Sequence, residues 1–289
     1  MNHLKRYDQA IFYNENMQKI NTKDLVFSNL RMPSIPFENQ WSGGEDGIAP
    51  VFVGANYQQR PITLDVKMFS VDVPDYYLLQ SEMFSIFGYN TPFYIVKKYE
   101  KGKRYRAILD SNFEIERIDP MYGTAELTFI TESLPFAEST GTTQDIQRDG
   151  INANSELWGF GMGLQSDPFA LQYTFDVNEE EGFRVFNAGN VPIHPFEKDF
   201  KMTIKNIVNA RGMVQIRNQR NMDYIRITDN DIKSSDVFVF DGANITKNGL
   251  NALRKTDRTF IGLEPGYNRF EIYHCDSATL EFDFRYYYR

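Results

Sequence analysis

The chain has 289 residues and a mass of 33.7 kDa, which is long enough for about two domains with buried cores. A formal net charge of -8 and a pI near 5.1 argue against non-specific nucleic-acid binding, because such binding needs a basic surface. The single cysteine, Cys275, excludes an internal disulfide and fits a protein made in a reducing cytoplasm.

Aromatic residues are unusually frequent and make up 15% of the chain. Rings bury a large area with few rotatable bonds, so this composition favours β-sheet faces and subunit contacts. The N-terminus lacks an apolar run, so we expect neither a signal peptide nor a membrane span.

Residues 1–138 are predicted to form the first domain. Residues 60–68 alternate between apolar and polar side chains, with Ile62, Leu64, Val66 and Met68 on one side, which is the period of a half-buried strand.

A helix is predicted to follow this strand. Pro74 and Asp75 suit a first helical turn, and Gly88 suits a helix end. The apolar residues between them recur at spacings of three and four, as expected for a helix with one buried face: Tyr76, Leu79, Met83, Ile86 and Phe87.

The rest of the first domain is predicted to be strands. Residues 93–99 and 103–109 form a hairpin, and residues 113–118 and 124–131 form two more strands. A sheet with one helix packed on it is an α+β domain.

Residues 139–156 are predicted to be a linker, because Ser, Thr, Gly, Gln and Asp replace the apolar periodicity there. Residues 157–289 are predicted to be an all-β antiparallel sandwich. Its expected strands are residues 169–177, 183–187, 200–208, 213–218, 224–228, 237–240, 259–262, 269–274 and 279–288. The fold class is therefore mainly β.

Candidates for catalysis and binding are few. The three histidines, His3, His194 and His274, have no zinc-binding spacing, so no metal and no cofactor are expected. A dyad of His274 and Cys275 is disfavoured because neighbours on a strand point to opposite faces. No catalytic residue is assigned and the ligand-binding residues stay unknown, so we expect a protein that is not an enzyme.

Two glycine- or charge-rich segments have ordinary structural explanations. Gly159-x-Gly161-x-Gly163 lacks a preceding strand and a following helix, so it is interpreted as a flexible entry into the sandwich and not as a phosphate loop. Residues 179–181, three consecutive glutamates, are interpreted as a solvated loop.

The end of the chain carries a turn with specific chemistry. The pattern Leu263-x-Pro265-Gly266-x-Asn268 follows a strand-like segment and precedes two more. It resembles the C-terminal end of the distal tail proteins of long-tailed bacteriophages, which carry Leu-x-Pro-Gly-x-Asn before their closing strands.

Three further segments are similar to the same family in matching order. Arg60-x-Ile62-x-Leu64 resembles its early strand, residues 134–137 (Leu-Pro-Phe-Ala) the end of its ring domain, and residues 186–195 the start of its second sheet. Leu134 departs from the acidic or Asn residue that is frequent in the family. Each motif alone also suits an ordinary turn, and Gly189 in residues 186–195 is expected to supply a positive φ.

The resemblance implies a structural protein of the virion, made in the host cytoplasm and located at the distal end of the phage tail. It implies a homo-hexamer whose first domains form a ring or belt, with galectin-like sandwiches outside it. The ring would connect the tail tube to the baseplate or tip. Its expected partners are the tail tube protein, a tail-tip (tail-associated) protein and a receptor-binding protein, with no nucleic acid and no membrane.

The alternative is a lectin-like, carbohydrate-binding adhesion module. Exposed Trp or Tyr on a concave sheet face would favour it, and the chain has only two tryptophans, Trp41 and Trp158.

Overall fold

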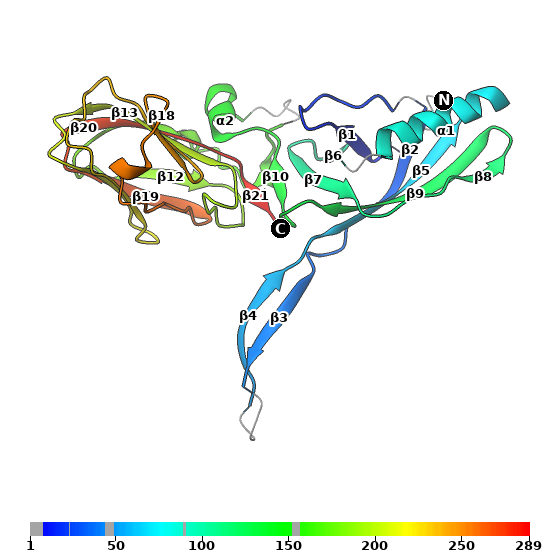
Figure 1. The fold of residues 1–289 in the computed structure, drawn as a ribbon, viewed down its shortest axis with the longest axis horizontal. Helices are drawn as coiled ribbons and strands as arrows, with labels where there is room; N and C mark the ends of the chain where they lie inside the picture. The colour runs from blue at the N-terminus through cyan, green and yellow to red at the C-terminus, as the bar shows by residue number, and fades with distance from the viewer. Residues whose placement is uncertain (1–7, 23, 44–48, 89–90, 152–156) are drawn as a thin grey trace. The chain divides into compact units, whose positions relative to one another are not determined.

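The computed structural model describes residues 8–22, 24–43, 49–88, 91–151 and 157–289. The chain divides into two compact units, Met1–Ala137 with Arg289, and Glu138–Tyr288. Figure 1 shows the course of the chain through both. Within the described residues, no helix is long and apolar enough to cross a membrane.

The first unit is built on an antiparallel sheet with the order β1-β6-β7-β9-β5-β2, and β8 pairs with β9. The hairpin β3–β4 forms a separate two-stranded sheet. The bounds of these strands are β1 Ala10–Tyr13, β2 Leu25–Arg31, β3 Phe37–Ser42, β4 Val51–Tyr57, β5 Pro61–Phe69, β6 Phe93–Lys97, β7 Lys103–Leu109, β8 Glu116–Asp119 and β9 Tyr122–Thr131.

Strand β5 confirms the predicted alternation. Ile62, Leu64 and Val66 are fully buried, and they lie opposite Phe129, Leu127 and Ala125 on β9. Because side chains alternate between the two faces of a strand, this register places two apolar rows side by side on one face.

Helix α1 (Val73–Phe87) confirms the predicted helix. The Asp72 side chain caps its start by accepting a hydrogen bond of 2.8 Å from the Asp75 N–H. Four of the five predicted core residues are buried, and Ile86 is half-buried. The helix ends at Gly88 without a left-handed residue, since the φ of Gly88 is -77°.

Aromatic rings make the core under this helix. Phe87 of α1 lies 5.2 Å from Phe12 and 6.1 Å from Phe129, between ring centroids. At Gly123 a Cβ would lie 2.8 Å from the Tyr76 hydroxyl, so glycine there makes room for the helix. Part of the aromatic excess of the chain therefore packs between helix α1 and the sheet.

The strand predictions for the first unit need two corrections. Strands β1 to β4 were not predicted, because β1 is short and both faces of β3 and β4 are exposed, which removes the alternating pattern. The strand predicted at residues 113–118 is instead β8, and it begins only at Glu116.

The predicted linker, residues 139–156, is wrong for the residues that the structure describes. Strand β10 (Ala137–Ser139) and helix α2 (Thr143–Asp149) lie there. Ile146 is fully buried, and the Thr143 hydroxyl donates to the Phe282 carbonyl at 3.0 Å and accepts from the Phe284 N–H at 3.0 Å. A polar sequence is ordered here because strand β20 supplies its partners. Residues 152–156 lie outside the described residues.

The second unit is a sandwich of two antiparallel sheets, β11-β20-β13-β16-β17-β18 and β12-β19-β14-β15. Rings from both sheets meet between them: Phe282 lies 5.0 Å from Phe270 and 6.1 Å from Phe183, between centroids. The bounds are β11 Thr174–Asn178, β12 Phe183–Asn187, β13 Phe200–Val208, β14 Val214–Asn218, β15 Tyr224–Ile227, β16 Phe238–Asp241, β17 Asn244–Lys247, β18 Leu250–Asn251, β19 Gly266–Tyr273, β20 Ser277–Phe284 and β21 Tyr287–Tyr288.

Most predicted strands of the sandwich are present, and β12 and β13 have the predicted bounds. Residues 259–262 do not form a strand, and Pro168–Leu171 is a 3-10 helix, so β11 begins later than predicted. Strands β17 and β18 were not predicted because they are short and partly exposed.

Candidate functional site

The turn at residues 263–268 is held by one buried side chain. Asn268 is fully buried, and its Oδ1 accepts from the Glu264 N–H at 2.9 Å while its Nδ2 donates to the carbonyls of Glu264 and Gly266 at 2.7 and 3.1 Å. Gly266 has a φ of +86°, which favours glycine. Leu263 exchanges two backbone hydrogen bonds with Ile193, of 2.7 and 2.9 Å. The motif is therefore a structural device that fixes the start of β19.

The segment 186–195 is organised in a similar way. The Asn187 Oδ1 accepts from the Gly189 N–H at 3.0 Å, and its Nδ2 donates to the Val191 carbonyl at 3.3 Å. A Cβ at Gly189 would lie 2.6 Å from the Tyr287 carbonyl oxygen, whereas its φ is not positive. Glycine is therefore needed there because the chain passes close to the last strand, and not because of a positive φ, as was predicted.

The most exposed apolar surface of the first unit is the β3–β4 hairpin. In Figure 1 it extends away from the sheet of the same unit. Its large apolar side chains are 46 to 63% exposed: Phe37, Trp41, Val51, Phe52, Val53 and Tyr57. Trp41 and Phe52 face each other across the strands, with ring centroids 5.5 Å apart. An isolated two-stranded hairpin is marginally stable in water, so this surface fits a contact with another chain.

A second exposed apolar surface lies on helix α1. Leu78 is 70% exposed, and Val73, Tyr77 and Phe84 are also exposed. Arg117 of β8 extends over this side of the helix: its Nη1 donates to the Tyr77 hydroxyl at 3.1 Å, and its guanidinium lies 4.6 Å from the Tyr76 ring centroid. One unit thus carries two different apolar surfaces.

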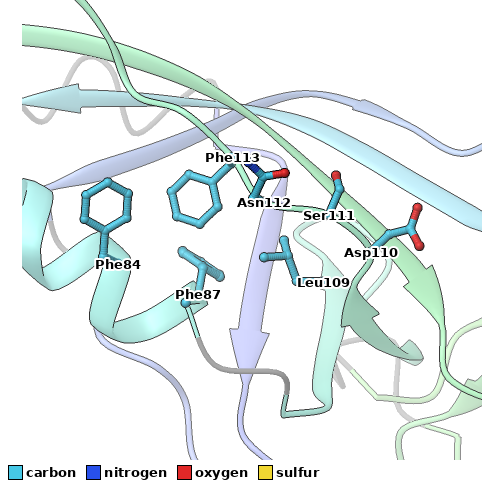
Figure 2. A pocket seen from close by; sticks show the side chains of 8 residues that line it. Phe84, Phe87, Leu109, Asp110, Ser111, Asn112 and Phe113 are labelled. Atoms are coloured by element: carbon cyan, nitrogen blue, oxygen red, sulfur yellow. The ribbon is translucent and has the colours of Figure 1, made fainter.

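A shallow pocket of about 440 Å³ opens at the end of α1. Figure 2 shows Phe84 and Phe113 together on one side and Asp110, Ser111 and Asn112 on the other. The two Phe ring centroids are 5.5 Å apart. An apolar floor with a polar rim suits an apolar side chain of a protein partner.

The structure does not bring the candidate catalytic residues together. His274 follows the end of β19 and has a φ of +66°, so it lies in a turn and not on a strand as expected. Cys275 is fully buried, and burial raises the pKa of its thiol to about 11. His194 lies beside Phe196, with ring centroids 5.3 Å apart, and His3 is outside the described residues. Within the described ranges, no group of three or more His, Cys, Asp and Glu residues is arranged to hold a metal ion.

The remaining candidates have structural roles. Gly163 has a φ of +73°, and a Cβ there would lie 2.6 Å from the Ala188 carbonyl oxygen. In the predicted solvated loop, Glu179 forms an ion pair with Arg211 and accepts from the His274 N–H at 2.8 Å. The glutamate run is therefore partly used to anchor a neighbouring turn.

The tryptophans do not form a sugar-stacking face on the sandwich. Trp158 is 1% exposed, and a Cβ at Gly141 would lie 2.4 Å from its ring, so glycine makes room for it. Trp41 is exposed, but it lies on the hairpin of the first unit.

Comparison with known proteins relates the first unit to phage tail proteins. Residues 17–131 match the model of the phage tail protein RIFT-related domain. The first unit is a phage tail protein domain. The match includes the hairpin, α1 and most of the sheet beneath it, so both apolar surfaces lie within the matched residues. The predicted relation to phage tail proteins is confirmed.

Solved structures extend the likeness over the whole chain. The Dit protein of phage SPP1, described as a paradigm of the hub adsorption apparatus in phages that infect Gram-positive bacteria, has a TM-score of 0.67 at 11% identity, covering 96% of this chain and 99% of that one. The baseplate of phage P2 in its activated conformation with Ca gives a TM-score of 0.46 at 12% identity, covering 96% and 97%. No curated protein matches. At 11% identity, the likeness to the SPP1 Dit protein shows the fold of the chain.

Sequence reasoning missed the hairpin. Two features of the sequence could have indicated it: the aromatic and β-branched residues on either side of Gly43, and Gly43 itself, whose φ is +84°. They were not interpreted as strands because apolar and polar residues do not alternate there.

Proposed function

We propose that this protein is a distal tail protein that assembles into a closed homo-hexameric ring, joins the tail tube to the baseplate or tip, and docks host-recognition proteins. Its work is mechanical, and it is not an enzyme. The observation that carries the proposal is the pair of different apolar surfaces on the first unit, the β3–β4 hairpin and the outer side of α1.

A cyclic ring needs two different complementary surfaces on each subunit, because every copy contacts its neighbour head to tail. The hairpin offers one, with side chains about half exposed before assembly. Complete burial of a large apolar side chain contributes about 1.5–3 kcal/mol, so each half-exposed one adds roughly 1 kcal/mol when the ring closes. Several such side chains per contact support a specific interface.

The number six and the positions of the tube and tip proteins rest on the resemblance to distal tail proteins, which the fold of the Dit protein of phage SPP1 supports. The sandwich is proposed to lie outside the ring and to carry docking surface for the receptor-binding or tip proteins. The domain division proposed for this arrangement is a belt of residues 1–138 and a sandwich of residues 157–289.

Light scattering of the full chain tests the ring. Six times 33.7 kDa gives about 202 kDa. The double variant Trp41→Ser/Phe52→Ser is expected to shift the mass towards 33.7 kDa without changing thermal stability, since both side chains are already exposed. The matched control is Phe169→Ser/Leu250→Ser, two exposed apolar residues of the second unit, which should leave the mass unchanged.

A hairpin variant that assembles like the wild type would contradict the role given to this surface. Location is tested separately by immunogold labelling of intact phage particles. Label at the distal end of the tail is expected, and label along the capsid would contradict the proposal, as would sugar release from cell-wall polysaccharide by the purified protein.

A further inference from the structure

The outer face of the sheet β12-β19-β14-β15 is unusually rich in arginine. Alternation along these strands turns ten side chains outward: Arg184, Phe186, Gln215, Arg217, Tyr224, Arg226, Tyr267, Arg269, Glu271 and Tyr273. None of the ten is aliphatic, and the single phenylalanine, Phe186, is only 6% exposed and lies beside Tyr267, with ring centroids 4.8 Å apart. Four arginines and one glutamate make this face positive, although the whole chain has a net charge of -8.

The register arranges the arginines in a diagonal row. Arg184 lies directly opposite Arg269. Arg217 lies opposite Glu271, which comes two residues after Arg269 on β19. Arg226 lies opposite Gln215, which comes two residues before Arg217 on β14. Strands lie about 4.8 Å apart and rise about 3.4 Å per residue, so each diagonal step is about 8 Å. The row crosses all four strands.

The single carboxylate on the face does not neutralise this row. Glu271 accepts from Gln219 Nε2 at 2.6 Å, contacts Arg269 at 3.2 Å and bonds the Tyr273 hydroxyl. In the described part of the chain the guanidinium groups of Arg184, Arg217 and Arg226 form no ion pair with a carboxylate.

Arg217 has unused donor capacity. Its buried Nε has no hydrogen-bond partner in the described ranges, and its Nη2 meets the weakly accepting sulfur of Met222 at 3.6 Å. An acceptor oxygen of a ligand would replace the weak contact between Nη2 and this sulfur.

Arginines cover two of the three tyrosine rings of this face, and the third tyrosine, Tyr273, donates its hydroxyl to Glu271. The guanidinium of Arg226 lies 4.5 Å from the Tyr224 ring centroid, and that of Arg184 lies 4.9 Å from the Tyr267 ring centroid. A neutral sugar or an unstacked base needs a free ring to stack on. These rings instead orient the guanidinium groups, which favours recognition of anionic groups by charge and hydrogen bonding.

We propose that this arginine face binds a linear acidic polysaccharide whose carboxylate or phosphate groups lie along the diagonal row of Arg184, Arg269, Arg217 and Arg226. A linear acidic polymer is favoured over a folded protein because the arginines follow one row with diagonal steps of about 8 Å, so that successive charges of an extended chain can meet them in turn. The inference goes beyond the proposed ring and does not depend on it, because a monomer would carry the same face.

Binding of polygalacturonate to the full chain tests the proposal, with neutral dextran as the comparison. At about 50 mM salt polygalacturonate is expected to bind and dextran is not, and raising the salt to about 500 mM should abolish binding because screening weakens exposed charge pairs. The variant Arg184→Gln/Arg269→Gln should raise the Kd about tenfold, since two charge-assisted contacts are lost. Both side chains are exposed, so the fold is retained, and thermal unfolding verifies this.

The charge-matched control is Lys201→Gln/Arg148→Gln, which removes two exposed cations from β13 and from α2, and both of these elements belong to or pack on the other sheet of the sandwich. It should keep the Kd within about twofold of the wild type. Absence of polygalacturonate binding, or equal weakening by both variants, would overturn the proposal. Tighter binding of poly-L-glutamate or of a single-stranded DNA oligonucleotide would overturn the assignment to a polysaccharide. Loss of ring assembly in the hairpin variant with polygalacturonate binding retained would separate this proposal from the ring.

Discussion

Replacing Asn268 by alanine should destabilise the sandwich strongly. Its side chain makes the three turn hydrogen bonds to Glu264 and Gly266, and its Oδ1 also accepts from Asn218 Nδ2 at 3.1 Å. At about 1 kcal/mol net for each, four bonds amount to roughly 4 kcal/mol. Loss of the fourth bond should cost less than this, because Asn218 Nδ2 keeps a partner through its bond of 3.0 Å to the Gly262 carbonyl, and we therefore expect a loss of about 3 kcal/mol.

For a unit of this size, about 1 kcal/mol corresponds to roughly 2–4 °C, so the unfolding transition of the sandwich in Asn268→Ala should fall by about 6–12 °C. Differential scanning calorimetry of the full chain measures it. Asn268→Asp should be at least as damaging, because a carboxylate would face the carbonyls of Glu264 and Gly266 without an N–H to donate.

Asn230→Ala is the matched control, since Asn230 is exposed and makes no side-chain hydrogen bond to any described residue. It should leave the transition unchanged. If Asn268→Ala unfolded within about 2 °C of the wild type, the turn would not depend on this side chain and the reasoning would be refuted.

Three further predictions concern single features of the sandwich. Gly266→Val should cost about 1 kcal/mol or more, because the φ of +86° is unfavourable for a β-branched residue, and a thermal shift below about 1 °C would contradict this. Burial alone would raise the pKa values of Asp229 and Asp236, but hydrogen bonds, those from Lys247 first, lower both to about 2. Because these folded-state pKa values lie below the ordinary 3.8, the stabilisation is present above about pH 4 and should be lost as the pH falls to about 2, which an acid titration of stability would measure. Lys247→Met should weaken that dependence without removing it, because Lys255 still pairs with Asp229 and Asn248 still donates to Asp236. The Cys275 thiol, whose pKa burial raises to about 11, should resist a thiol reagent at pH 8 in the native protein and react at once after unfolding, and rapid native labelling would contradict its burial.

Local sequence patterns were enough to predict a strand or helix that buries one face against a single core. The alternation in β5, the apolar stripe of α1 and the bounds of β12 and β13 were predictable because a buried face requires apolar residues at a regular spacing. The candidate surfaces were not predictable in the same way. The β3–β4 hairpin has two exposed faces, so no core imposed a period on it.

The sequence by itself determined the class of fold, the helix, and the turn chemistry around Gly266 and Asn268, because these depend on neighbours within a few residues. Only the tertiary structure decided that the polar segment containing α2 is ordered, since Thr143 finds its hydrogen-bonding partners on β20, more than a hundred residues later. The arginine row likewise depends on the pairing of four strands, and pairing order is set by the packing of the whole sandwich and not by the local sequence of any strand.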